Sequence, residues 1–365
     1  MYTKMIQKNI ISRINDTQWR IFMAITGGGQ TFIGDYLSVS GASRVIQGAF
    51  VPYSKPAFDK FVGTVSNYVG DVAARKLAVA SFDEAVRYGI PAHMALGLGV
   101  SSSLAKDGER EGREHRIHVA IHKHDETEEF SLLLQQGRTR EEEEAIANDY
   151  ILQCLAWSTG VLQVKPSYSG LKEGEKEKQG FGRNGVHTGI CKGTAKLAFV
   201  NFIPRLQSSL VVYPGSWNPF HAAHQAIYDA AQQVTGSKPV FELSIANVDK
   251  GRLDYIEIAR RCEELQNKPY VLTMAPTFDL KAHLFAIYNR PIVFVVGADT
   301  WSRVWDRRYS GHLPTLERLF TSLNVRFLVF GREGDTIKSG YEHLRIMDDR
   351  ATNFNMSISS SQLRG

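Results

Sequence analysis

Two histidines at the start of a predicted helix are the residues of this chain best placed for chemistry on a phosphate. They belong to the segment Tyr213–His224, YPGSWNPFHAAH, which follows the apolar run Leu210–Val212 and precedes helix-forming residues 225–231. This order predicts a strand, a turn rich in Gly and Pro, and a helix. The first N–H groups of a helix are unpaired and its dipole is positive there, so an anion is favoured at that end. We therefore expect His221 and His224 to face a phosphate.

The same segment resembles the GxFxPxHxGH signature of the HIGH-motif nucleotidyltransferases. The positions in register are Gly215, Trp217, Asn218, Pro219, His221 and His224, and Ala223 replaces the usual glycine. The resemblance implies a Rossmann-like domain with a parallel sheet, and nucleotide contacts from Gly215, Ser216, Trp217 and Asn218. Histidines at this spacing also occur in zinc sites, but no third ligand with helical or strand spacing stands nearby, so we expect no metal bound by the protein itself.

Three later segments extend this resemblance to the nicotinamide-nucleotide adenylyltransferase branch. They are NVDKGRLD (247–254), GAD (297–299) and SISSSQLR (357–364), and they occur in the family's order. The family's KPPLD loop is altered, because Gly251 and Arg252 replace its two prolines. The apolar run 292–296 before GAD is typical of a buried parallel strand, and ligands bind beyond the carboxyl ends of such strands. Asp299 is therefore expected to hold a ribose hydroxyl or a substrate amide, with capping of the next helix as the alternative.

The resemblance implies attack by the phosphate oxygen of a mononucleotide on the α-phosphorus of ATP, with pyrophosphate leaving. Such a reaction needs no protein nucleophile, and catalysis depends on positioning and on neutralising phosphate charge. His221 and His224 would hold the α- and β-phosphates, and Lys250 the acceptor phosphate. Arg364, Ser359 and Ser360 would grip the β/γ side, and Mg²⁺ would arrive on the phosphates of ATP. Further substrate contacts are expected from Asn247, Phe278, Gly297 and Trp305.

The first half alternates strand-like and helical segments, which predicts an α/β layer fold. It resembles the C-terminal amidase domain of the CinA family, the nicotinamide-nucleotide amidases, through TGGG (26–29) and the segments 40–54 and 97–121. Ala24 stands at the family's serine nucleophile and Phe58 at its lysine. Because alanine cannot act as a nucleophile, we predict that amidase activity is lost. A degenerate pocket that still suits a nucleotide would remain at Ala24, Thr26, Gly27, Tyr53, Phe58 and Ser101.

These resemblances divide the chain into an amidase-like domain (1–162), a linker (163–206) and a nucleotidyltransferase domain (207–365). The middle segment is rich in Gly, Lys and Glu, and such a composition cannot bury enough apolar surface to offset its ordering entropy. The apolar segment GTAKLAFVNFI (193–203) at its end predicts an edge strand of either domain. A helix is predicted from Thr139 to Trp157, with the acidic residues 141–144 in its first turn. In HRIHVAIH, His118 and His122 should lie on one strand face and His115 on the other.

Composition sets the outer bounds. The 365 residues are 43% hydrophobic and 22% charged, as in soluble globular proteins, and the net charge of +5 is scattered, which suits small nucleotides better than nucleic acid. The three cysteines are far apart, which fits a reducing cytoplasm. No apolar run approaches the roughly 20 residues of a membrane span. Amidase-type domains of the CinA family usually self-associate, so we expect a homo-oligomer through the N-terminal domain.

The leading hypothesis is therefore adenylyl transfer from ATP to nicotinamide or nicotinate mononucleotide. Two alternatives stay open. Another HIGH-motif nucleotidyltransferase, making a CDP-alcohol or a coenzyme A precursor, would be favoured by a pocket without stacking side chains near Trp301, Trp305 or Phe278. A non-catalytic nucleotide sensor would bind ATP without releasing pyrophosphate.

Overall fold

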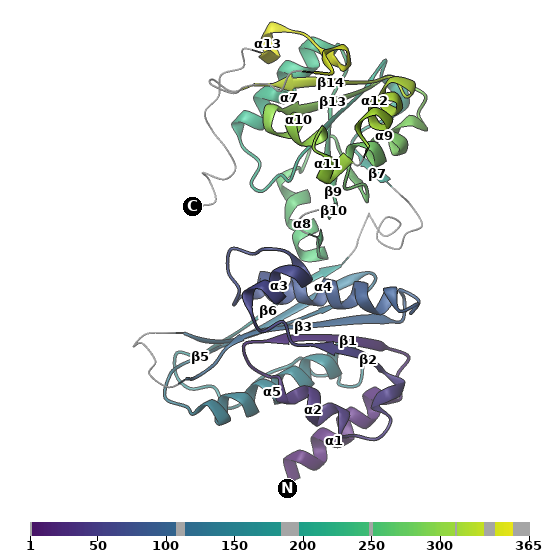
Figure 1. The fold of residues 1–365 in the computed structure, drawn as a ribbon. Helices are drawn as coiled ribbons and strands as arrows, with labels where there is room; N and C mark the ends of the chain where they lie inside the picture. The colour runs from purple at the N-terminus through teal and green to yellow at the C-terminus, as the bar shows by residue number, and fades with distance from the viewer. Residues whose placement is uncertain are drawn as a thin grey trace. The chain divides into compact units, whose positions relative to one another are not determined.

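The computed structural model describes residues 2–106, 114–183, 197–247, 251–310, 312–331 and 340–352, and its fold is mixed α/β (Figure 1). The chain forms two compact units. The first unit comprises Met1–Gly185 and Lys250–Glu257, and the second comprises Val186–Asp249 and Ile258–Gly365. Of the helices described, none is long and apolar enough to cross a membrane.

The first unit is built on a six-stranded mixed sheet. Its strand order is β2 (Ile46–Phe50), β1 (Arg20–Thr26), β3 (Ala95–Ser103), β4 (His115–His122), β5 (Glu126–Leu134) and β6 (Lys176–Arg183). The pairs of β1 with β2 and β3 are parallel, and the remaining pairs are antiparallel.

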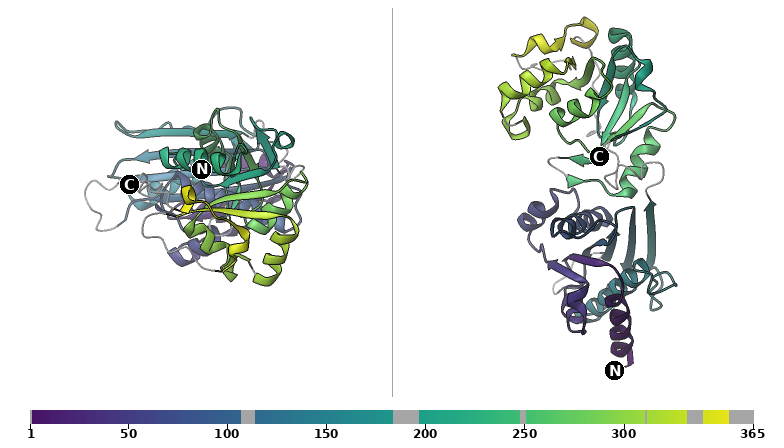
Figure 2. Two further views of the ribbon diagram at one scale, coloured as in Figure 1. Left: turned by 90° about the horizontal axis from the view of Figure 1, so that it is seen from above. Right: turned by 90° about the vertical axis from the view of Figure 1, so that its right-hand side faces the viewer.

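Helices cover both faces of this sheet, as Figures 1 and 2 show. On one face lie α1 (Tyr2–Asn15), α2 (Thr31–Leu37) and α5 (Arg140–Ser158), whose buried residues share a core with β1. On the other face lie α3 (Lys55–Val62) and α4 (Asp71–Arg87). The predicted helix start at Thr139 is confirmed, because its side chain and that of Glu142 form a capping box at α5. A 3₁₀ turn, η1 (Ala42–Arg44), precedes β2.

The expected linker is wrong for its middle part. Lys176–Arg183 forms β6, which pairs with β5 from Leu133 to Glu126. This ladder and polar contacts hold the strand, and few of its residues are buried. Just before the strand, the buried carboxylate of Glu175 pairs with Arg138. Glu175 also accepts a hydrogen bond from the N–H of Gln135 at 2.9 Å. Composition alone misses such an edge strand, because its backbone partners lie 43 to 57 residues away in the chain.

The segment Lys250–Glu257, which carries β11 (Gly251–Arg252) and the start of α8 (Tyr255–Glu264), belongs to the first unit. Arg75 of α4 pairs with Asp254 at 3.1 Å and also with Glu129 of β5, and all three are buried. The ring of Tyr255 stacks on that of His122, with centroids 5.2 Å apart and planes at 12°.

The second unit is built on a seven-stranded sheet. Its order is β15 (Arg345–Ile346), β14 (Val325–Phe330), β13 (Ile292–Gly297), β8 (Leu210–Pro214), β9 (Val240–Ser244), β12 (Tyr270–Thr273) and β7 (Leu197–Val200). All neighbours are parallel except β12 and β7, so the apolar segment at the end of the expected linker is an antiparallel edge strand of this unit. The expected Rossmann-like parallel sheet is confirmed.

Helices cover both faces of the second sheet as well. The large core contains buried residues of α9 (Phe278–Ala286), α10 (Ala298–Val304) and α12 (Leu313–Ser322). On the other face, Tyr228 of α7 (Ala222–Thr235) stacks on Phe241 of β9, with ring centroids 4.9 Å apart. The shorter elements are η2 (Pro204–Leu206), β10 (Ala246–Asn247), α11 (Arg307–Ser310), η3 (Glu342–Leu344) and α13 (Asp349–Thr352).

The order of the strands reverses between β8 and β13. From β8 the chain continues through β9 to β12 on one side of the sheet, then returns to β13 and β14 on the other side. In a parallel sheet such a reversal leaves a crevice beyond the carboxyl ends of the two strands, and ligands bind there. The histidine turn follows β8 and GAD follows β13, so the topology places both at this crevice.

Candidate active site

The two histidines lie together at the start of α7, as the sequence predicts. His221 is the residue that precedes the helix, and its backbone N–H donates to Nδ1 of His224 at 3.3 Å. Their rings are stacked, with centroids 3.6 Å apart and planes at 22°. Two imidazoles at the start of a 14-residue helix form a donor pair suited to phosphate oxygens.

The side chain of Trp217 supports this turn from within the core. Its ring is 1% exposed and packs against Phe241 at 4.9 Å and His224 at 5.0 Å between centroids. Its Nε1 donates to the backbone oxygen of Glu242 at 3.0 Å, and the N–H of Gly215 donates to the same oxygen at 3.0 Å. The indole therefore belongs to the core, and the expected nucleotide contact at this position is left to the backbone of Trp217. A Cβ at Gly215 would lie 2.5 Å from the indole, so only glycine fits there.

The carboxylate of Glu242 lies in a buried ionic cluster that sequence reasoning missed. Lys281 of α9 pairs with it at 2.8 Å, and the two residues are 4% and 1% exposed. Lys281 also donates to the backbone oxygen of Ala275 at 2.6 Å, and the hydroxyl of Thr273 donates to Glu242. The cluster thus joins the strand beneath the histidine turn to the loop that follows β12. The only signal in the sequence is a charged residue in the middle of an apolar strand, VFELS, and another in an apolar helix.

The remaining polar residues expected at the crevice are accessible. Ser216 and Asp299 are exposed, and Asn218 and Gly297 are half-buried. Asp299 lies in the first turn of α10, with Oδ1 only 2.9 Å from the place of a Cβ on Gly297. The residue that caps α10 is Gly297, so the capping alternative is wrong for Asp299, although its charge is favourable at the positive end of the helix. The ligand contact stays a prediction.

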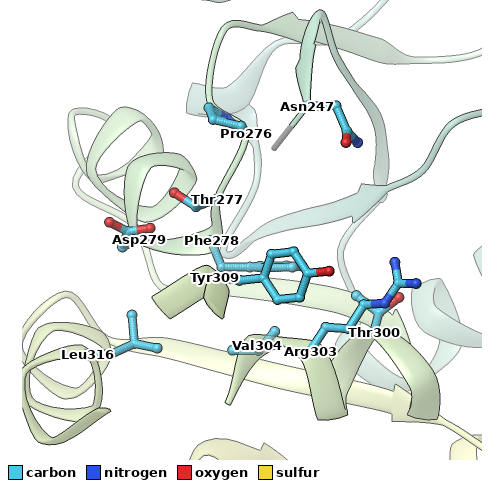
Figure 3. Close-up of a pocket in the computed structure, with 10 residues that line it drawn as sticks. All are labelled: Asn247, Pro276, Thr277, Phe278, Asp279, Thr300, Arg303, Val304, Tyr309 and Leu316. Carbon is cyan, nitrogen blue, oxygen red and sulfur yellow. The ribbon is translucent and has the colours of Figure 1, made fainter. Parts of the chain in front are cut away.

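A cavity of about 140 Å³ opens among β10, the loop after β12, and helices α10 to α12 (Figure 3). Two of its residues, Asn247 and Phe278, are predicted substrate contacts. Sequence reasoning missed the others, which are Pro276, Thr277, Asp279, Thr300, Arg303, Val304, Tyr309 and Leu316. Figure 3 shows the rings of Phe278 and Tyr309 in the middle of the cavity, and we call this aromatic side its floor. An aromatic surface edged by polar groups is suited to a flat heterocycle.

The expected stacking by Trp301 and Trp305 is wrong. Both are almost fully buried, and the ring of Trp305 stacks on Tyr341, with centroids 3.7 Å apart and planes at 9°. The reason is the helical period of α10, which turns Trp301, Val304 and Trp305 toward the core and Thr300 and Arg303 toward the cavity.

Four other expected site residues, Lys250, Ser359, Ser360 and Arg364, lie outside the described residues.

The position expected to be a degenerate amidase site in the first unit is filled by apolar side chains. Ala24 and Phe58 belong to one buried cluster with Val62, Ala73 and Leu77. A nucleophile or a lysine at these places would therefore have no polar surroundings.

The polar groups expected around that position already have partners within the chain. Thr26 donates its hydroxyl to the oxygen of Pro52 at 3.2 Å, and Ser101 donates to the oxygen of Tyr68 at 2.8 Å. Tyr53 is 69% exposed. Gly27 has φ 81°, and a Cβ there would lie 1.8 Å from the oxygen of Ser102, so the turn requires glycine.

The glycine turn itself is capped by a carboxylate of the chain. Glu144 of α5 accepts hydrogen bonds from the N–H of Gly29 at 2.9 Å and from the hydroxyl of Thr31 at 3.2 Å. Arg140 donates to the oxygen of Gly27 at 3.0 Å. The donors that would serve a nucleotide phosphate thus face an anion that the protein supplies.

The comparisons with known proteins agree with this division. The family model described as cytidylyltransferase-like matches residues 212–365, which supports nucleotidyl transfer by the second unit in general terms. Among curated proteins, none matches the chain significantly.

The similar solved structures belong to the competence-damaged protein (CinA) group. A CinA-superfamily protein from Escherichia coli is 14% identical and covers 43% of this chain and 90% of its own, with a TM-score of 0.33. The competence/damage-inducible protein CihA from Agrobacterium tumefaciens is 16% identical and covers 43% and 94%, with a TM-score of 0.35. The competence damage-inducible protein A from Klebsiella pneumoniae is 14% identical and covers 44% and 99%, with a TM-score of 0.36.

Proposed function

We propose that the second unit transfers the adenylyl group of ATP to the phosphate of nicotinate or nicotinamide mononucleotide, and so forms the dinucleotide and pyrophosphate. The observation that carries the proposal is the stacked pair His221 and His224 at the start of α7, beside the crevice where the strand order reverses. The cytidylyltransferase-like match over the same region supports the reaction class.

The proposed step uses no covalent intermediate on the protein. An oxygen of the acceptor phosphate forms a bond to the α-phosphorus of ATP, and the bond from that phosphorus to the β-phosphate oxygen breaks, so that pyrophosphate leaves with the electron pair. His221 and His224 would donate hydrogen bonds to the phosphate oxygens as charge moves to the leaving group, and such preorganised donors stabilise the transition state. Mg²⁺ carried by ATP would neutralise further phosphate charge.

The aromatic cavity supports a pyridine-containing acceptor. Phe278 and Tyr309 offer ring faces for stacking, whereas a CDP-alcohol or coenzyme A precursor would not need an aromatic floor. The cavity is lined by residues of β10 and of the segment after β12. In the sheet, β12 pairs with β9, and β9 pairs with β8, the strand that leads into the histidine turn. The second unit thus offers a place for the base as well as donors for the phosphates.

The test is an acceptor screen that detects pyrophosphate. The full-length protein is incubated with ATP or CTP and with nicotinamide mononucleotide, nicotinate mononucleotide, phosphopantetheine or glycerol phosphate. We expect release only with ATP and a pyridine mononucleotide. Release with CTP and glycerol phosphate would favour the cytidylyltransferase alternative, and ATP binding without any release would favour a sensor.

A further inference from the structure

We propose that Arg303 recognises an anionic group on the ring of the acceptor, so that the protein takes the acid, nicotinate mononucleotide, in preference to the amide. This inference rests on the proposed function and names the substrate class of the same cavity. It depends on the charges that line the cavity and on the positions of its two aromatic rings.

Arg303 is the only cation among the described residues that line this cavity, and it is exposed. It lies on α10 three residues after Thr300, and Figure 3 shows its guanidinium beside Thr300, at the end of the cavity away from Leu316. In the part of the chain that the structure describes, its guanidinium forms no ion pair. A cationic fork is therefore available at one end of the site.

The opposite charge lies at the other end of the cavity. In the view of Figure 3, Asp279 lies on the side of the cavity opposite to Arg303, and the rings of Phe278 and Tyr309 are drawn between them. A ring that lies on this floor therefore meets a cation at one end and an anion at the other.

The ring of nicotinate mononucleotide has the complementary charges. Its pyridinium nitrogen is cationic, which favours the faces of aromatic rings and the neighbourhood of a carboxylate. Its carboxylate suits the planar fork of an arginine, which donates two parallel hydrogen bonds. The amide of nicotinamide is neutral and offers a guanidinium one acceptor, its carbonyl oxygen, because its NH₂ group can only donate. A phosphate of the acceptor is the other anion that Arg303 could hold, and the experiment must separate the two sources.

The test compares both acceptors in wild-type protein, in Arg303→Gln and in Arg307→Gln. Arg307 is an exposed arginine on the neighbouring α11 that does not line the cavity, so it serves as the matched control. We expect the wild-type kcat/KM to favour the acid at least about tenfold. Arg303→Gln should lower kcat/KM for the acid by about 10- to 100-fold, as expected for a hydrogen bond to a charged group, and for the amide by less than about threefold. Arg307→Gln should change neither.

An equal loss for both acceptors in Arg303→Gln would assign the residue to the shared phosphate and overturn the proposal. A wild-type preference for the amide would also overturn it. Calorimetric binding of each mononucleotide to the wild-type protein separates this proposal from the proposed function. Tighter binding of the acid without pyrophosphate release would support the role of Arg303 and contradict adenylyl transfer, whereas equal binding of the two would contradict the role of Arg303.

Discussion

At the scale of single residues, the candidate site depends on a pair of imidazoles whose geometry the backbone sets. The N–H of His221 is bonded to the ring of His224, and the buried indole of Trp217 lies under that ring. These contacts fix the pair before any ligand binds. Preorganised donors act without reorganisation at the moment of reaction, so the pair should contribute chiefly to rate.

Replacement of either histidine should therefore affect turnover more than folding. We expect His221→Ala or His224→Ala to lower kcat by about 10²- to 10³-fold, the usual effect of removing one such donor. Pyrophosphate release measures the rate, and circular dichroism with thermal unfolding serves as the control for folding. Near-wild-type kinetics in the double variant would contradict the mechanism.

A second prediction concerns the lost nucleophile. Ala24→Ser should not restore release of ammonia from nicotinamide mononucleotide, because the new hydroxyl would lie in the apolar cluster with Phe58. Burying that hydroxyl without a partner should lower the free energy of unfolding by about 1–3 kcal/mol. Ammonia assays and urea unfolding of the full-length variant measure both effects. Ammonia release above the wild-type level would show that the position is still competent.

Two strand histidines should make the stability of the first unit depend on pH. His118 and His122 donate or accept at Nδ1 with Ser131 and Thr127, each at 2.7 Å, and both lie on the strand face predicted from their spacing. Burial lowers the pKa of His118 to about 4 from 6.5, and burial also lowers the pKa of His122 well below 6.5. Between about pH 4 and pH 6.5, these histidines bind protons in the unfolded chain but not in the folded chain. The free energy of unfolding therefore falls as the pH decreases from about 6.5 toward 4.

This dependence can be measured by urea unfolding at about pH 7 and about pH 5. In the variant His118→Gln the loss of stability between the two conditions should be smaller than in the wild type. The exposed His93 offers a control, since His93→Gln should leave the loss unchanged. An identical loss in all three proteins would show that other groups cause the dependence.

At the scale of elements, the buried pair Glu242 and Lys281 couples β9 to α9. The main chain of Glu242 holds the histidine turn, while Lys281 holds the loop that leads to Phe278 in the cavity wall. Two loops that we propose to contact different parts of a substrate are thus fixed to one ionic cluster. A buried charge without its partner is strongly destabilising, whereas replacing both partners by apolar residues is often tolerated.

Lys281→Met should therefore destabilise the second unit by about 3–5 kcal/mol, because it leaves Glu242 buried and unpaired. The double variant Glu242→Leu with Lys281→Met should be less destabilised than the single one. Urea unfolding followed by the fluorescence of the buried Trp217, Trp301 and Trp305 reports on this unit. Lys238→Met, at an exposed lysine, is the control. A double variant no more stable than the single one would contradict the argument.

The local order of the site could be read from the sequence, because it depends on neighbours in the chain. Strand, turn and helix around His221 and His224 follow from apolar runs and helix formers, and Asn247, which lines the cavity, is expected from the NVDK motif. The residues of each such segment are neighbours in the chain, so the sequence pattern predicts their local structure. What the sequence could not predict depends on tertiary contacts.

Aromatic side chains show this limit most clearly. Trp217 and Trp305 lie in or beside motifs, but both are buried. The sequence does not distinguish a tryptophan that packs in the core from one that stacks on a ligand. Arg303 and Tyr309 carry no motif, and only the packing of α10 and α11 brings them to Phe278. The strand Lys176–Arg183 reads as a polar linker, and its place in the sheet follows from ladder partners far along the chain.

At the scale of the whole molecule, we predict self-association through the first unit. Its edge strand β2 ends at Phe50, which is 38% exposed and is followed by Val51 at 41%. An unpaired edge with exposed apolar side chains is a ready site for pairing with another chain. The second unit offers a control, because Ile287 is 71% exposed there.

Light scattering of the full-length protein should show an oligomer at micromolar concentration. Phe50→Asp should reduce the mass of the particle, while Ile287→Asp should not. A monomeric wild type, or dissociation caused only by Ile287→Asp, would contradict this prediction.

The assignment of Lys250–Glu257 to the first unit has a consequence for how such a protein can be rearranged. The chain leaves the first unit after Gly185, returns for eight residues and leaves again after Glu257, so it crosses between the units three times. A single cut, by a protease or at a gene boundary, cannot yield two complete halves. A cut after Gly185 separates the short segment from its partners Arg75, Thr127 and His122, whereas a cut after Glu257 leaves part of the second unit on the piece that holds the first. A relative that exchanges its first unit for another would have to exchange this short segment as well, because the segment pairs with Arg75. The sequence of the segment and the sequence of the first unit must therefore change together.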